Sequence, residues 1–198
     1  MTAILTRLGR LHDTVFGAFS KLFDHGLGGL LARLVFAGVL LVYYWHSAGL
    51  KVEDGLSGFF SIRPAAYFQI LPSVVEAYGY DPSQVPFFPW GLIVTAGTYA
   101  EFLLPLLVVV GLFTRLAALG MIGFIAVQSF VDIAFHGANE AAVGVWFDRL
   151  PDALIFDQRA FWVLLLVTLV AKGGGWLSLD QLAGRFLPKA RKATAAGG

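Results

Sequence analysis

The chain has 198 residues, of which 58% are hydrophobic and 14% are charged. A soluble domain has about 45–50% apolar and about 25% charged residues, so the deficit in charge indicates a membrane protein. The net charge of +1 provides no overall field for nucleic acid, and the lack of cysteine excludes disulfides, iron–sulfur clusters and thiol redox relays.

Residues 1–27 predict an amphipathic helix that lies in the membrane interface. They have no continuous apolar core and no small-residue cleavage site, so they do not match a signal peptide. Apolar residues recur every three or four positions, and the opposite face is polar and basic. The apolar set is Ile4, Leu8, Leu11, Val15, Ala18 and Leu22, and the polar set is Arg7, Arg10, Thr14, Gly17, Lys21 and Asp24. Packing against a protein partner is the alternative.

Four apolar stretches approach the ~20 residues that cross the hydrocarbon core of a bilayer. They are Leu30–Leu50, Trp90–Leu112, Leu116–His136 and Asp157–Trp176. Arg33 and Lys172 lie near span ends, where we expect their long side chains to extend to the membrane surface. The predicted fold is therefore all-α, a four-helix transmembrane bundle in residues 28–182. A basic, disordered cytoplasmic tail is expected in residues 183–198.

The distribution of positive charge predicts that both termini are cytoplasmic, because Lys and Arg accumulate on that side of membrane proteins. Ten basic residues fall on the side of the termini and of the turn after the second span, and four fall on the other side. The ten are Arg7, Arg10, Lys21, Arg33, Arg115, Lys172, Arg185, Lys189, Arg191 and Lys192, and the four are Lys51, Arg63, Arg149 and Arg159. We therefore expect a multi-pass protein of the cell inner membrane.

The long segment Lys51–Pro89 separates the first and second spans and is expected on the outer side. Loops of this length without structure are uncommon, so we expect short helices at Pro64–Leu71 and Ser73–Tyr78, separated at Pro72. The many aromatic residues of the segment have two interpretations. They form a belt at the depth of the lipid headgroups, or they form a lid over a pocket that opens outward.

Polar residues inside the spans are the candidates for function, since an ionisable group costs about 2.5–3.5 kcal/mol at the bilayer centre on insertion scales. They are Glu101 and Thr98 in the second span, Gln128, Asp132 and His136 in the third, and His46 in the first. At about 1.5 Å per residue, their depths run from mid-membrane to the outer surface. We therefore expect them to line one polar cavity that opens outward.

This polar cluster has four interpretations. It is structural, with Glu101 protonated because burial disfavours a charged carboxyl. It binds a small redox substrate such as a quinol, whose oxygens need a proton donor and acceptor such as His46, Glu101 or Asp132. It binds a metal ion, since its histidines and carboxylates are adequate ligands, although they come from three helices and have no ligand-spacing motif. It takes part in the transport of ions or a small solute.

Three segments carry more specific motifs. The second span contains Glu101 and ends in Gly111-Leu-Phe-Thr-Arg-Leu-Ala-Ala118. The fourth ends in Gly173-Gly-Gly-Trp-Leu-Ser-Leu-Asp180, and the first closes with Ser47-Ala-Gly-Leu-Lys51. Together they resemble the DoxX family of four-helix inner-membrane proteins, over about residues 32–182. The first-span close and the Val85–Pro89 stretch resemble most the members encoded beside small metal-binding peptide modification enzymes.

The resemblance implies that Glu101, Arg115 and Lys51 are functional residues. Some family members are subunits of thiosulfate:quinone oxidoreductases, and others are linked to oxidative-stress complexes. We therefore expect a quinone-linked redox process beside a protein partner subunit, with quinone as the cofactor and without haem or a metal. The predicted catalytic residues are Glu101, His46 and Asp132, and the predicted cofactor-binding residues are Gln128, Lys51, Arg115 and Thr98.

Two other functions remain open. The alternative is a non-enzymatic membrane subunit that anchors or stabilises a redox or metal-handling complex, and the third is a small-solute or ion transporter. The long Lys51–Pro89 segment departs from the shorter members of the DoxX family, so the resemblance does not support thiosulfate as the substrate.

Overall fold

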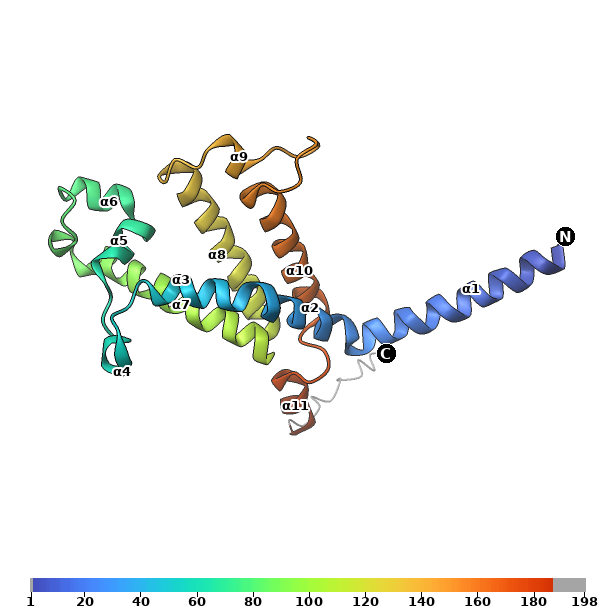
Figure 1. Ribbon diagram of the computed structural model, residues 1–198. Coiled ribbons are helices and arrows are strands. Elements are labelled where there is room, and N and C mark those ends of the chain that lie inside the picture. The colour runs from blue at the N-terminus through green and yellow to red at the C-terminus, as the bar shows by residue number, and fades with distance from the viewer. Residues whose placement is uncertain (1, 187–198) are drawn as a thin grey trace, which may run out of the picture.

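The computed structural model describes residues 2–186, and this part of the chain is helical (Figure 1). Its β structure is limited, within those residues, to one isolated bridge between Val52 and Ile62. Four helices are long and apolar enough to cross a membrane. The predicted all-α class and the number of candidate spans are therefore confirmed.

Each candidate span is built from one or more helical segments. The first candidate runs from Leu5 to Gly49, and its part within the bundle is α2 (Gly28–Phe36), the π-helical η2 (Ala37–Leu41) and α3 (Val42–Gly49). The second is the π-helical η4 (Phe87–Gly91) and α7 (Leu92–Val110), and the third is α8 (Thr114–Ala134). The fourth is the π-helical η5 (Leu154–Gln158) and α10 (Arg159–Lys172). The fourth span was predicted to continue to Trp176. It ends at Lys172, because the three glycines that follow favour a left-handed C-terminal stop over another helical turn.

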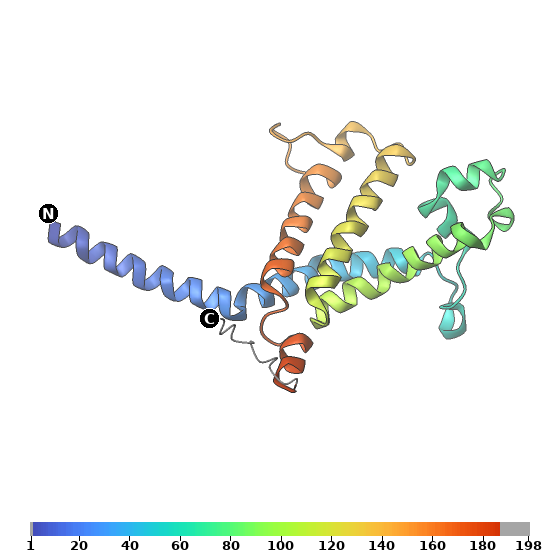
Figure 2. The same cartoon turned by 180° about the vertical axis from the view of Figure 1, so that it is seen from behind.

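The four spans form two pairs, α3 beside α7 and α8 beside α10 (Figures 1 and 2). The pairs meet at one end and diverge at the other. We call the diverging end, with residues 50–86 and 135–153, the loop end, and the opposite end, with residues 111–113 and 173–186, the turn end. All four spans contribute to the core, which contains Phe36, Leu40, Tyr44, Val108, Met121 and Leu166. Their outward faces expose apolar side chains such as Val42, Phe130 and Phe161, as helices surrounded by lipid do.

The loop end contains short helices. They are α4 (Gly55–Gly58), α5 (Pro64–Ile70), α6 (Pro72–Ala77), the 3-10 helix η3 (Pro82–Gln84) and α9 (Glu140–Val143). Both predicted helices are present as α5 and α6. Pro72 begins α6 and does not merely separate the two, since the first position of a helix needs no N–H donor.

At the turn end, the guanidinium of Arg33 is buried, which corrects the expectation that it extends to the membrane surface. It donates to the carbonyl oxygens of Val108, Val109, Gly174, Trp176 and Leu177 at 2.6–3.3 Å. The first two belong to the last turn of α7, whose carbonyls have no partner within the helix. Arg33 therefore joins the second span to the segment that follows the fourth.

Two glycines allow this close packing. A Cβ on Gly29 would collide with the carbonyl oxygen of Gly173, so only glycine lets α2 approach the segment after α10. Gly111 has φ 72°, a left-handed conformation that ends α7, and a Cβ there would lie 2.5 Å from Ser178 Cβ. The glycine-containing motifs of the sequence thus have a packing role.

The first and the last helix of the described residues both adjoin the turn end of the bundle (Figures 1 and 2). Helix α1 (Thr2–Leu22) leads through the π-helical η1 (Phe23–Leu27), kinked at Gly26, and projects away from the bundle (Figures 1 and 2). Its apolar side chains, among them Leu8 and Leu11, are exposed, and its position in the membrane interface remains a prediction. Helix α11 (Leu179–Phe186) continues past the expected start of the tail at residue 183. The tail from residue 187 lies outside the described residues.

The predicted orientation can be tested with single cysteines, because the native chain has none. Ser83 is exposed at the loop end, and Gly184 on α11 has open space around it. In intact cells we expect a membrane-impermeant maleimide to label Ser83→Cys, and to label Gly184→Cys only after the cells are opened. Labelling of both positions from the same side would contradict four crossings.

Candidate functional site

A cavity of about 530 Å³ lies at the loop end between α7 and α8, with further walls from α3 and α5. Its volume is within the ~300–1,000 Å³ of typical small-molecule sites. Most of the lining is apolar or glycine. The polar lining residues are Ser47, Lys51, Gln69, Glu101, Gln128, Asp132 and His136. The cavity therefore combines an apolar slot with a few convergent polar groups.

Lys51 and Glu101 form an ion pair on one wall of this cavity. Lys51 Nζ lies 2.6 Å from Glu101 Oε2, and the two residues are only 5% and 3% exposed. The same ammonium donates to the carbonyl and to the hydroxyl of Ser47, one turn earlier in α3. All three of its N–H donors are thus used. The expectation that Glu101 points inward is correct, but its partner is a cation, which the expectation of a neutral carboxyl did not include.

A second ion pair involves the opposite wall. Arg159 Nη2 lies 2.6 Å from Asp132 Oδ2, and Arg159 Nη1 donates to Ser129 Oγ at 2.8 Å. Arg159 was expected among the cations of the outer loops. It is 3% exposed instead, because it starts α10, which packs along α8. An unpaired Asp132 inside the third span was the available signal that a buried cation was needed.

Gln128 leaves one hydrogen-bonding atom unused beside the cavity. Its Nε2 donates to the Tyr43 hydroxyl at 3.1 Å, whereas its Oε1 is buried without a partner among the described residues. Tyr44 Oη and Arg159 Nε are also buried without a hydrogen-bond partner among the described residues. Buried polar groups in proteins almost always have partners, so such atoms point to a bound molecule or water that satisfies them.

The predicted set of site residues is brought together only in part. Glu101, Gln128, Asp132 and Lys51 share the cavity, and so does His136, whose Nε2 lies 3.1 Å from the carbonyl oxygen of Gln69. The i, i+4, i+8 spacing along the third span therefore identified the correct face of α8.

Three predicted residues lie elsewhere. His46 is exposed and is not part of the cavity wall. Thr98 is buried, and its hydroxyl donates to the Val94 carbonyl in its own helix. Arg115 lies at the turn end. Within residues 2–186, no group of three or more His, Asp or Glu side chains is placed to bind a metal.

Comparisons of the chain with protein-family models, with curated proteins and with solved structures gave no match. The likeness of the two turn-end motifs to the DoxX family remains a prediction.

Proposed function

We propose that the protein binds a quinone or quinol in the cavity between α7 and α8, as a DoxX-like membrane component of a quinone-linked redox process. The observation that carries this proposal is the buried Lys51–Glu101 pair on the wall of an otherwise apolar cavity. A quinone is a flat apolar ring with an oxygen at each end. It therefore needs an apolar slot with a donor and an acceptor placed at its rim.

The polar groups of the cavity suit the two states of such a ligand. The Glu101 carboxylate can accept the proton of a quinol hydroxyl, and the Lys51 ammonium can donate to a quinone oxygen when it exchanges its bond to the Ser47 hydroxyl for that oxygen. Gln128 Oε1 is an unused acceptor for the second hydroxyl. Oxidation of a quinol releases two protons and two electrons. The protons pass to Glu101 and the loop end, and the electrons pass to an electron-accepting protein subunit of the same complex.

The position of α5 supports the interpretation of the long segment between the first two spans as a lid. Gln69 and Ile70 of α5 belong to the cavity wall, so this helix closes part of the site. Since the loop end is predicted to be the outer side, the cavity exchanges protons with that side of the membrane.

The proposal is tested by titrating the purified full chain, in lipid nanodiscs, with a short-chain benzoquinone and measuring the quenching of tryptophan fluorescence. We expect Gln128→Leu to weaken binding about fivefold, since one neutral hydrogen bond contributes about 1 kcal/mol. Glu101→Gln should weaken it roughly 10–100-fold, because a hydrogen bond to a charged group contributes about 1.5–3 kcal/mol. The matched control is Thr98→Val, one helical turn from Glu101 but outside the cavity, and its affinity should be unchanged.

A non-enzymatic anchoring subunit is the second candidate. One observation favours it: the carboxylates of Glu101 and Asp132 are already paired within the protein, as structural groups are. On this alternative the native chain gives no saturable quenching by the quinone, and the three variants behave alike. That result would overturn the quinone proposal.

A further inference from the structure

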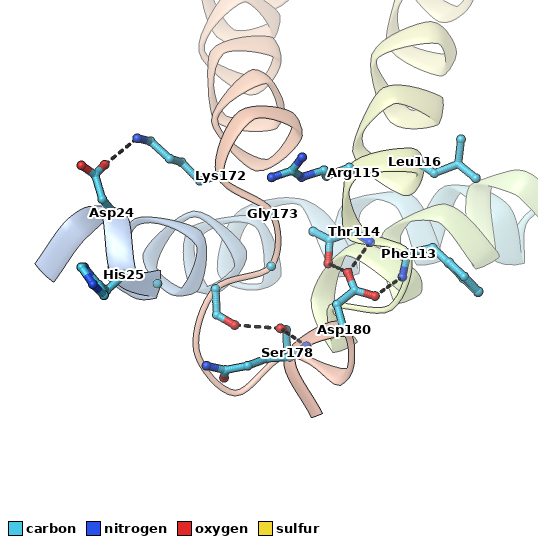
Figure 3. Close-up of a pocket in the computed structure, with 14 residues that line it drawn as sticks. Asp24, His25, Phe113, Thr114, Arg115, Leu116, Lys172, Gly173, Ser178 and Asp180 are labelled. Carbon is cyan, nitrogen blue, oxygen red and sulfur yellow. Dashed lines mark hydrogen bonds and ion pairs between the residues drawn. The ribbon is translucent and has the colours of Figure 1, made fainter. Parts of the chain in front are cut away.

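A second pocket, of about 510 Å³, lies at the turn end, and it shares no lining residue with the quinone cavity (Figure 3). Its walls come from segments far apart in the sequence. They include Asp24 and His25 of η1, Thr114 and Arg115 of α8, Lys172 at the end of α10, and Asp180 of α11. The function proposed above uses none of these residues.

Both carboxylates of this pocket are already satisfied. Asp24 Oδ1 lies 2.5 Å from Lys172 Nζ. Asp180 accepts hydrogen bonds from the backbone N–H groups of Phe113 and Thr114 and from the Thr114 hydroxyl, at 2.7–2.8 Å (Figure 3). It thereby caps the first turn of α8, as an acidic side chain at a helix N-terminus does. Neither carboxylate needs a further cation.

Arg115 is a cation of this pocket that pairs with neither carboxylate. Its side chain points into the pocket toward the glycine segment after α10 (Figure 3). Among the described residues its hydrogen bonding is limited to one contact with the Ala171 carbonyl oxygen, at 3.3 Å, and it has no acidic partner. Lys172 uses one of its three N–H donors on Asp24. Arg115 and Lys172 are therefore two cations of the pocket that keep N–H donors for a ligand.

The rim of the pocket is apolar on its α8 side. Phe113 and Leu116 line it, and both are largely exposed, as is Leu119 one turn further along the helix. Because α7, α8 and α10 all begin or end here, the cationic donors lie at headgroup depth and the apolar side chains lie toward the hydrocarbon. This combination fits a ligand with an anionic head and an apolar tail.

We propose that the turn-end pocket binds the phosphate group of an anionic phospholipid. A guanidinium makes two parallel hydrogen bonds to a phosphate, and the Lys172 ammonium supplies a further donor. The acyl chains pack along Leu116 and Leu119. Basic pockets between spans on the cytoplasmic side are places where anionic headgroups bind, and the positive charges of this chain predict that the turn end is cytoplasmic.

The test is native mass spectrometry of the full chain in detergent, titrated in parallel with phosphatidylglycerol, with phosphatidylcholine and with inorganic phosphate. We expect phosphatidylglycerol to bind at least fivefold more tightly than phosphatidylcholine. Arg115→Gln should lower this affinity about fivefold, since one basic residue near the surface contributes about 1 kcal/mol. Arg185→Gln is the matched control, because Arg185 is exposed on α11 outside the pocket, and it should have no effect.

Three results would overturn the assignment. They are equal binding of the two lipids, unchanged binding after Arg115→Gln, and displacement of the lipid by inorganic phosphate at the same concentration, which would make free phosphate the ligand. If Arg115→Gln fails to fold, the double variant Asp24→Asn with Lys172→Gln removes the second cation without leaving a lone charge. Gln128→Leu should leave lipid binding unchanged, so this test does not depend on the quinone proposal.

Discussion

Replacement of Arg33 by methionine should lower the free energy of unfolding by roughly 3–5 kcal/mol, because it strands several buried carbonyls that each cost about 1–3 kcal/mol when water does not reach them. Five carbonyl oxygens from two segments accept from this one guanidinium, and among them the Val108 oxygen also accepts from the N–H of Gly111. Methionine fills much of the same volume, so the loss reports hydrogen bonding more than packing.

The measurement is thermal or denaturant unfolding in detergent, followed by circular dichroism. Arg33→Lys should be intermediate, since an ammonium keeps the charge but has three donors and lacks the planar fork of guanidinium. The control is Arg185→Met, at an exposed cation of α11, where we expect a change within about 0.5 kcal/mol. A loss for Arg33→Met no larger than that of the control would contradict the inference that Arg33 joins the second span to the segment after the fourth.

Replacement of Lys51 by methionine should cost about 3–5 kcal/mol, since it leaves the Glu101 carboxylate buried without a counter-charge. The two groups are almost fully buried, so water cannot take the place of the ammonium. Addition of Glu101→Leu should recover most of this loss, because apolar side chains of similar volume replace a buried pair at little net cost.

A surface ion pair provides the comparison. Arg63 pairs with Glu53 and Asp54, whose side chains are 51% and 99% exposed. We expect Arg63→Met to cost about 0–1 kcal/mol, as exposed pairs do. The three variants are compared with the native chain by unfolding in the same detergent. Equal losses for Lys51→Met and Arg63→Met would show that the Lys51–Glu101 pair is not desolvated.

The spans and the short helices could be predicted because their signals are local. Apolar runs of sufficient length identify the crossings, and a proline at the start of α5 and of α6 is compatible with the first helical position. The inward face of α8 followed from the spacing of Gln128, Asp132 and His136. Each of these features depends on residues within a few helical turns.

The buried cations could not be predicted in the same way. Arg33 and Arg159 lie near span ends, where a long side chain can extend to the surface or turn inward with equal ease. The choice depends on acceptors supplied by other helices, 27 or more residues away in sequence. A local signal did exist for His46. Leu40, Tyr44 and Ala48 repeat every four residues and mark the buried face of the first span, and His46 lies off that face.

The contacts of Arg33 also impose an order on the assembly of the structure while the chain is being synthesised. Its acceptors at the end of α7 are 75 and 76 residues downstream, whereas Gly174 is 141 residues downstream. At about 5–20 residues per second, Gly174 leaves the ribosome roughly 7–28 s after Arg33. The first two spans can therefore associate during elongation with a half-satisfied guanidinium between them. The turn end closes only after the fourth span and the segment that follows it have been synthesised.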